Sequence, residues 1–320
     1  MKVLVTGATG KVGYSVASAL VERGDDVRVL VRDPAGARVP EGVERCKGDV
    51  RDTESLVGAV RGCELVFNAM GLPEQWLTDE RTFHEVNAVG SENVARAARA
   101  AGVRRMVHTS TIDVFEAAPG TRFDESKLAA TPKGTAYERS KQEAERLVLD
   151  ATGGMEVVMV NPSAVYGPGP TGSASPEEGL FRPLVKRRLP ALPPGGMGMV
   201  FSKGVAAGHL LAAERGTPGE RYILCDQHVT MRDLADRVVL LAGRGWVPPQ
   251  LSPRVARFLA AAGENLARMI RKPPLLPRGQ LYFFMWNAAP DSSKAQEQLG
   301  WEPTALDDGI RRTLEDMGIG

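Results

Sequence analysis

The first two dozen residues most constrain what this chain can fold into. An apolar run at 2–6 (KVLVT) is followed at once by Gly7, Gly10 and Gly13 and by a helix-like stretch near 12–23. In such a turn the first glycine permits the tight bend and the second lets backbone N–H groups approach a pyrophosphate. The third lets the helix lie close to the sheet. The helix N-terminus adds partial positive charge. The pattern predicts a dinucleotide-binding strand–turn–helix unit, with a turn that only packs as the alternative.

Short apolar runs alternate with helical patterns through the first half of the chain. The further expected strands are 26–31, 43–49, 64–70, 104–110 and 155–161, and the expected helices are 53–61, 85–101 and 135–152. Continuously apolar strands separated by helices indicate a parallel sheet covered on both faces. Right-handed crossovers then make a doubly wound sheet the simplest topology. The predicted fold class is therefore α/β with a doubly wound parallel sheet.

The second half of the chain has a different character. Two Pro- and Gly-rich stretches, 166–179 and 189–198, are typical of loops. Further patterns predict helices and one strand, at 204–215, 230–243, 252–270 and 304–317 for the helices and 220–225 for the strand. We expect a dinucleotide-binding domain at 1–165 and a smaller, mostly helical substrate-binding part at 166–320, with 200–228 returning to the sheet.

Composition excludes several classes of function. The 320 residues carry a net charge of only +1, which gives no electrostatic reason to expect a nucleic-acid partner. Three scattered cysteines do not form a disulfide framework, and the histidines lack metal-ligand spacing, so no metal is expected. No secretory leader and no membrane-spanning run are apparent. A cytoplasmic location is the expectation.

The end of the second expected strand bears on the choice of dinucleotide. Arg32 lies at that tip and Asp33 follows it. A guanidinium suits a 2′-phosphate, so NADP(H) is favoured over NAD(H). The alternative is a solvated Arg32 with Asp33 on the ribose of NAD. After the third strand, Asp49 and Val50 are expected at the adenine edge.

Two further patterns indicate proton transfer beside a hydride carrier. Tyr137 and Lys141 are four residues apart and share a helical face. A phenol has a reference pKa near 10, and a nearby ammonium together with an oxidised nicotinamide is expected to lower it. A hydroxyl at the end of the strand near 104–110 would orient the substrate oxygen. Ser110 and Thr111 both lie there, and only one can face a given side.

These segments resemble the extended short-chain dehydrogenase/reductase superfamily, also called the NAD-dependent epimerase/dehydratase family. The matching segments cover most of the chain: TGATGKVG (6–13), GDVRD (48–52), VNAVGSENVARAA (86–98), VHTSTIDVF (107–115), YERSK (137–141), NPSAVYGPG (161–169) and GHLLAAERGTPGERYIL (208–224). Within it, the branch with dihydroflavonol reductase-like and 3β-hydroxysteroid dehydrogenase-like enzymes is most similar. The resemblance implies a Rossmann fold and a nicotinamide cofactor. It also implies a catalytic set of Thr111, Tyr137 and Lys141, with Thr111 as the active hydroxyl of the pair.

The motifs together with the resemblance indicate which residues line the two ligand sites. The expected cofactor-binding residues are Gly7, Thr9, Gly10, Lys11, Val12, Arg32, Asp49, Val50, Asn68, Ala69, Met70, Thr109, Tyr137, Lys141, Asn161, Pro162 and Ala164. The expected substrate-binding residues are Leu72, Trp76, Thr111, Phe115 and Val165. These side chains are largely apolar, which favours a hydrophobic small molecule.

Two other segments affect the choice of substrate and surroundings. The stretch 199–210 lacks the His and paired acids common in the family, which weakens the inference to nucleotide sugars. The segment 254–286 is a candidate lid. The basic helix within it, 254–272, either lies on a membrane surface or packs its apolar face on the domain.

The sequence thus predicts an NADP(H)-dependent oxidoreductase that reduces a ketone or aldehyde of a hydrophobic molecule, or oxidises the alcohol. An NAD-retaining nucleotide-sugar epimerase or dehydratase is the alternative. A non-catalytic NADP-binding protein of the same fold is a third hypothesis. The resemblance suggests a homodimer through the helices near 85–101 and 135–152.

Overall fold

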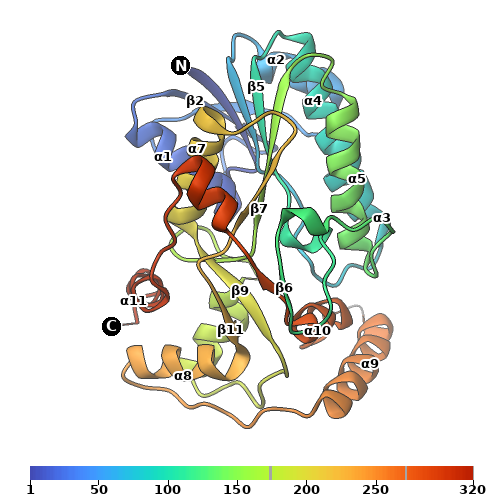
Figure 1. Cartoon of the computed structure of the whole chain (residues 1–320), viewed down its shortest axis with the longest axis vertical. Coiled ribbons are helices and arrows are strands. Elements are labelled where there is room, and N and C mark those ends of the chain that lie inside the picture. Colours follow the sequence, from blue (N-terminus) through green and yellow to red (C-terminus); the bar gives the residue numbers. More distant parts are fainter. Residues whose placement is uncertain (173–174, 271, 320) are drawn as a thin grey trace.

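The computed structural model describes residues 1–172, 175–270 and 272–319 (Figure 1). Arg271 of the basic segment lies outside the described residues. Seven parallel strands form the main sheet in the order β10-β7-β5-β4-β1-β2-β3. They are β1 (Lys2–Thr6), β2 (Asp26–Val31), β3 (Glu44–Lys47), β4 (Leu65–Asn68), β5 (Arg105–Thr109), β7 (Glu156–Pro162) and β10 (Arg221–Leu224). The predicted doubly wound parallel sheet is confirmed.

Helices cover both faces of this sheet (Figure 1). On one face lie α1 (Lys11–Glu22) and α7 (Ser202–Arg215), which pack against each other. The other face is covered by α2 (Thr53–Val60), α4 (Gly90–Ala100) and α5 (Ala136–Asp150), and α3 (Arg81–Phe83) with a π-helical segment (His84–Val89) leads into α4. The central strands are buried throughout because they are apolar on both sides.

The carboxyl ends of β1 and β4 mark the point where the strand order reverses. After β1 the chain adds β2 and β3 on one side, and then β4, β5, β7 and β10 on the other. In open α/β sheets, ligands bind in the crevice at this switch point. The structure therefore places the candidate site at the ends of β1, β4 and β5.

The second half builds a smaller layer below the sheet in Figure 1. A three-stranded sheet joins β8 (Ala164–Tyr166), β9 (Gly196–Phe201) and β11 (Gln227–Thr230), with β9 between the other two. Around it lie α6 (Arg182–Val185), α8 (Met231–Leu241), α9 (Pro253–Ile270), α10 (Arg278–Trp286) and α11 (Leu306–Asp316), and β6 (Arg122–Phe123) pairs with β12 (Ala289–Pro290). No helix among the described residues is long and apolar enough to cross a bilayer.

The segment 200–228 contains one strand of the main sheet and one helix that covers it. The strand β10 pairs with β7, and α7 lies against α1. The three-stranded sheet and α10 were not predicted. The strand β9 (GMGMVF) contains two glycines, and α10 is apolar on nearly all sides, so neither shows a clear period.

The turn after β1 depends on close backbone approach at Gly7. Gly7 has φ +73°, and a Cβ there would lie 2.5 Å from the Ala69 carbonyl oxygen. Gly24 has φ +88° but open space around it. We predict that Gly24→Ala costs about 1–2 kcal/mol of unfolding free energy from the left-handed backbone. Gly7→Ala costs more because the turn must also move away from β4. Urea denaturation of both variants measures the difference, and equal losses would show that the close approach is unimportant.

Candidate functional site

The turn before α1 leaves a cradle of backbone groups without side chains. Gly10 is the residue before the helix, and no side chain caps this helix. Thr9 and Gly10 are exposed at the mouth of the turn. Free N–H groups at a helix N-terminus attract phosphate. The glycines fit the predicted pyrophosphate position.

Lys11 has a different environment from the one expected. Its Nζ pairs with Glu177 at 3.0 Å and donates to the carbonyl of Gly167. Both side chains of the pair are almost fully buried. Lys11 therefore links α1 to the loop after β8, and its ammonium is not free for a phosphate. The neighbouring Val12 is half-buried against the core under the main sheet.

The ends of β2 and β3 enclose a small cavity of about 430 Å³. It is lined by Arg32, Lys47, Gly48, Asp49, Asp52 and Ser55. The Arg51 side chain hydrogen-bonds to Asp49 and lowers the pKa of that carboxyl, and Arg32 adds to this effect. The Asp33 carboxylate accepts the N–H of Ala35, two residues on, within its own loop. The cavity thus combines two cations, Arg32 and Lys47, with two acids, Asp49 and Asp52.

The end of β4 closes the floor of the crevice. Met70 and Val50 meet at Gly90, where a Cβ would lie 2.8 Å from Val50 and 3.2 Å from Met70. Asn68 differs from the expectation: its amide accepts from Thr6 at 2.6 Å, contacts His108 at 3.0 Å and is fully buried. Its side chain therefore holds β1, β4 and β5 together and does not reach the crevice.

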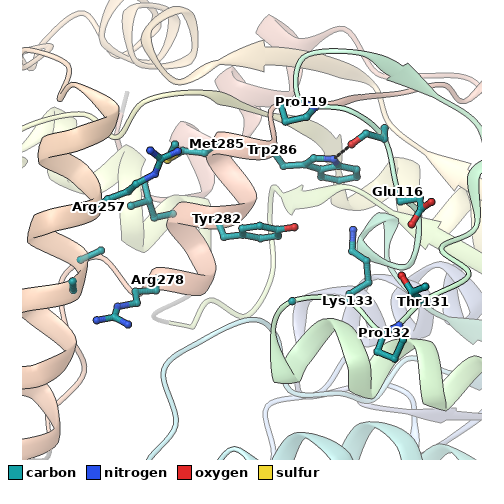
Figure 2. A pocket seen from close by; sticks show the side chains of 15 residues that line it. Glu116, Pro119, Thr131, Pro132, Lys133, Arg257, Arg278, Tyr282, Met285 and Trp286 are labelled. Carbon is teal, nitrogen blue, oxygen red and sulfur yellow. Dashed lines mark hydrogen bonds between the residues drawn. The ribbon is translucent and has the colours of Figure 1, made fainter.

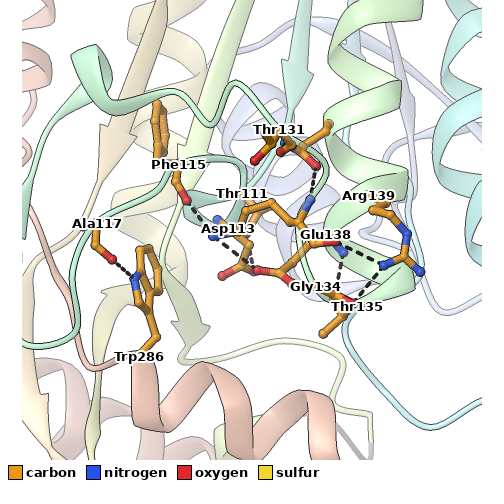
Figure 3. Close-up of polar contacts among 12 residues, drawn as sticks. Thr111, Asp113, Phe115, Ala117, Thr131, Gly134, Thr135, Glu138, Arg139 and Trp286 are labelled. Atoms are coloured by element: carbon orange, nitrogen blue, oxygen red, sulfur yellow. Dashed lines mark hydrogen bonds and ion pairs between the residues drawn. The ribbon is translucent and has the colours of Figure 1, made fainter.

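The two hydroxyls after β5 have unlike surroundings. The Thr111 hydroxyl donates to Asp113 at 2.9 Å (Figure 3). The Ser110 hydroxyl is buried and has no hydrogen-bond partner within the described residues. The Thr109 hydroxyl contacts His209 at 2.8 Å. Thr111 is the member of the pair that contacts other polar groups of the site.

Tyr137 and Lys141 lie in the first turns of α5, facing the end of β5. The Lys141 ammonium donates to the Thr109 carbonyl at 2.7 Å. Burial lowers the pKa of Lys141 to about 8, although Glu145 and Asp113 oppose the shift. A capping box between Thr135 and Glu138 starts the fifteen-residue helix α5 at this point. The ammonium also lies close to Gly71, in the loop after β4.

The pKa of Tyr137 moves in the direction opposite to the expected one. Burial raises it well above 10, and the charges of Asp113, Glu74 and Glu138 raise it further. A hydrogen bond with Thr111 opposes this shift. The expected lowering of this pKa was based only on the charges of Lys141 and of an oxidised cofactor. Loss of hydration is the largest cause of the raised pKa and the carboxyl groups add to it, so the chain by itself keeps the phenol protonated.

These carboxyl groups form a cluster that sequence reasoning missed. Burial raises the pKa of Asp113 to about 7 and that of Glu74 to about 8. Glu138 is buried and pairs with Lys133 at 3.4 Å. Two signals were available: a lone acid in the apolar run TIDVF, and the Thr-x-x-Glu spacing of a capping box.

A buried polar network fixes the segment after β5 that carries Thr111. The Asn161 amide, at the end of β7, donates to the Thr111 carbonyl and to Glu145, both at 3.0 Å. Glu145 in turn accepts from Arg221 of β10 at 2.7 Å. Asn161 is therefore a structural link between strand ends. Pro162 ends β7 and Ala164 begins β8, directly beside this network.

Figure 2 shows the residues that line a larger cavity of about 780 Å³. It is walled by α9, α10 and the loops before α5. Its lining is mainly apolar and basic, with one acid: Glu116, Ala117, Pro119, Thr131, Pro132, Lys133, Gly134, Arg257, Ala260, Ala261, Arg278, Leu281, Tyr282, Met285 and Trp286. Lys133, which pairs with Glu138, connects the cavity to the carboxyl cluster, whereas Thr111, Tyr137 and Lys141 do not line it. The candidate lid segment 254–286 supplies much of the wall.

The expected substrate-binding residues do not line this cavity. Phe115 is fully buried in a core cluster with Phe123 and Trp286, so its side chain supports the wall from behind. Leu72, Trp76 and Val165 are half-buried elsewhere around the crevice. Leu72 is held by Asn87 through its backbone N–H and carbonyl. The sequence could not show that α10 folds back to the end of β5.

The raised pKa of Asp113 gives a prediction about stability. Because its pKa is higher in the folded chain, its contribution to stability is greatest below about pH 4 and is lost as the pH rises through about 7. Asp113→Asn should therefore raise the melting temperature at pH 8 and change it little at pH 4. Each kcal/mol gained in unfolding free energy corresponds to a rise of roughly 2–4 °C. Thermal unfolding at both pH values, with exposed Asp316→Asn as control, measures this. An equal effect at both pH values would contradict it.

Comparison with known proteins places the chain among its relatives. Residues 3–225 match the family model described as the NAD dependent epimerase/dehydratase family. Sterol demethylase protein B of Methylococcus capsulatus is 32% identical, over 95% of this chain and 94% of that protein. The 4-hydroxy-2-methyl-3-oxo-4-farnesyl-3,4-dihydroquinoline-1-oxide ketoreductase of Stigmatella aurantiaca is 34% identical, over 99% and 92%.

Solved structures agree with the sequence relatives. The UDP-glucose 4-epimerase of Thermus thermophilus, solved in complex with NAD, superposes with a TM-score of 0.78 at 25% identity and covers 99% of both chains. Its likeness extends over the main sheet and the smaller layer. The chain belongs to the NAD-dependent epimerase/dehydratase family and is an NAD(P)-dependent enzyme of the extended short-chain dehydrogenase/reductase type.

Proposed function

We propose that this enzyme uses NADPH to reduce a ketone or aldehyde group of a hydrophobic small molecule. The observation that carries the proposal is the meeting of Thr111, Tyr137 and Lys141 at the end of β5, next to a large cavity with apolar and aromatic walls. A protonated phenol suits reduction, because a carbonyl needs a proton as it becomes an alcohol.

The crevice fits a dinucleotide. The glycine turn offers uncapped helix N–H groups at one end, and Lys141 faces Gly71 at the other. The nicotinamide cofactor, when bound, supplies the hydride for the carbonyl carbon. The residues Gly7, Gly10 and Met70 would hold its middle, and Arg32, Asp49 and Val50 its adenosine end.

The side chains of the site then donate the proton and stabilise the group that loses it. The Tyr137 phenol donates it to the carbonyl oxygen, and the Thr111 hydroxyl orients that oxygen. The Lys141 ammonium, fixed on the Thr109 carbonyl, stabilises the phenolate left after transfer. Asp113 holds the Thr111 hydroxyl through their hydrogen bond and is a positioning residue.

The preference for NADP(H) is supported by the small cavity after β2. Arg32 and Lys47 both line it, whereas Asp33 is occupied with its own loop. Two cations there suit a 2′-phosphate. The hydrophobic substrate class is supported by the cavity wall and by the ketoreductase relative, whose name describes a farnesyl-bearing quinoline oxide.

We predict that Tyr137→Phe lowers kcat by about a hundred- to ten-thousandfold, because the proton donor is lost, and leaves NADPH affinity nearly unchanged. Thr111→Ala should cost about a hundredfold, whereas Ser110→Ala, which removes a hydroxyl without a partner, should cost little. NADPH oxidation over a panel of steroids, flavonoid-like ketones, β-keto acids and aromatic aldehydes measures turnover. The reverse ranking of the two hydroxyl variants would refute the assignment of Thr111.

We predict that Arg32→Gln weakens NADPH binding by about ten- to hundredfold through loss of a charge-assisted hydrogen bond. NADH binding should barely change, and Asp33→Asn is the matched control. Titration of each cofactor by fluorescence gives both affinities. Equal effects on NADPH and NADH would exclude a 2′-phosphate contact. Release of stoichiometric NAD on denaturing the purified protein would instead support the epimerase or dehydratase alternative.

A further inference from the structure

The large exposed apolar side chains of this molecule are concentrated on one segment. Of the thirteen in the described residues, eight lie between Val255 and Tyr282. Phe258 is 72% exposed, Met269 82% and Leu275 99%. A monomer seldom presents such a concentration without a use for it.

The helix α9 exposes its large apolar side chains and buries small ones, which is the opposite of an ordinary surface helix. Its inner face is made of small residues, Ala256, Ala260 and Ala267, which are buried against the protein. We define the outer face of α9 as Val255, Phe258, Leu259, Leu266, Met269 and Ile270, all of them exposed. At 3.6 residues per turn, these large side chains lie opposite the alanines. The apolar face expected to pack on the domain therefore points away from it.

The charges beside this face have one sign. The stretch 253–282 contains six basic residues and one acid, although the whole chain has a net charge of only +1. The acid, Glu264, is buried on the inner side and is paired with Arg278 at 3.3 Å. Arg254 and Arg268 lie on one flank of the outer face and are exposed. Arg257 is also exposed but lines the large cavity. Their surroundings suit a partner that is apolar inside and anionic at its surface.

We propose that the outer face of α9 binds the surface of an anionic lipid bilayer, with the helix lying parallel to it. Apolar side chains would enter the acyl boundary while the arginines reach lipid phosphates. Figure 1 shows α9 at the outer edge of the molecule, clear of the main sheet. A second copy of the chain fits less well, because a twofold contact would bring the arginine flanks of two helices together.

The position of α9 suggests that this contact has the purpose of bringing an apolar substrate to the large cavity. Arg257, labelled in Figure 2, and Ala260 and Ala261 of the same helix line the large cavity. A bilayer on the outer face of α9 would therefore lie one helix away from the cavity. An apolar substrate held in the membrane would have a short path to the cavity. Only this purpose rests on the proposed function; the binding of lipid does not.

The test is vesicle flotation of the full chain. We expect binding to vesicles of phosphatidylcholine with one quarter phosphatidylglycerol, and little binding to phosphatidylcholine alone. The double variant Phe258→Glu/Met269→Glu should lose binding. Leu240→Glu on α8 is the matched control, because Leu240 is 77% exposed but lies outside the segment; it should bind like the unchanged chain. These exposed positions leave the core intact, and thermal unfolding checks this.

A second pair of variants separates charge from apolar contact. Arg254→Gln and Arg268→Gln should each weaken binding to the anionic vesicles by about fivefold, with a loss that shrinks at high salt. Absence of binding by the unchanged chain, or equal binding by the double glutamate variant, would overturn the proposal. So would a dimer of the unchanged chain that the double variant converts to monomer, since a second copy would then occupy the face.

Discussion

The site depends on one buried carboxylate, Glu145 of α5. It accepts from Asn161 and from Arg221, and Asn161 also holds the carbonyl of Thr111. Its negative charge also counteracts the cost of burying the Lys141 ammonium. Charges removed from water are tolerated only when they are paired and hydrogen-bonded. One side chain thus fixes the ends of β5, β7 and β10 and keeps α5 in register with them.

The surroundings of Tyr137 show that a family pattern does not define an electrostatic environment. The tyrosine and lysine occur at the spacing that usually promotes a phenolate. Around them this chain places Asp113, Glu74 and Glu138, and these acids together with burial favour the neutral phenol. The same residue types can therefore prepare a site to give a proton or to take one, depending on carboxyl groups that other segments of the chain bring to it.

Local sequence patterns predicted those elements whose formation depends on interactions between residues close in the chain. The parallel sheet, the glycine turn and the helix carrying Tyr137 follow from periodicity and turn chemistry, and the structure has them where expected. What the sequence could not reveal depends on contacts distant along the chain. Examples are the pairing of Lys11 with Glu177, the burial of Asn68 between Thr6 and His108, and the return of Trp286 to Phe123. Each of these contacts joins segments that are far apart in the sequence, so no local pattern indicates it.

The alanines of α9 have a consequence for how relatives of this enzyme could diverge. Ala260 and Ala261 bound the large cavity with single methyl groups, and Ala256 lets the helix lie close to its neighbours. The small size of these side chains therefore sets the breadth of the cavity. A bulkier residue at one of these positions would shorten the space for a ligand without disturbing the strand ends, so selectivity could change by volume alone while the chemistry stays constant.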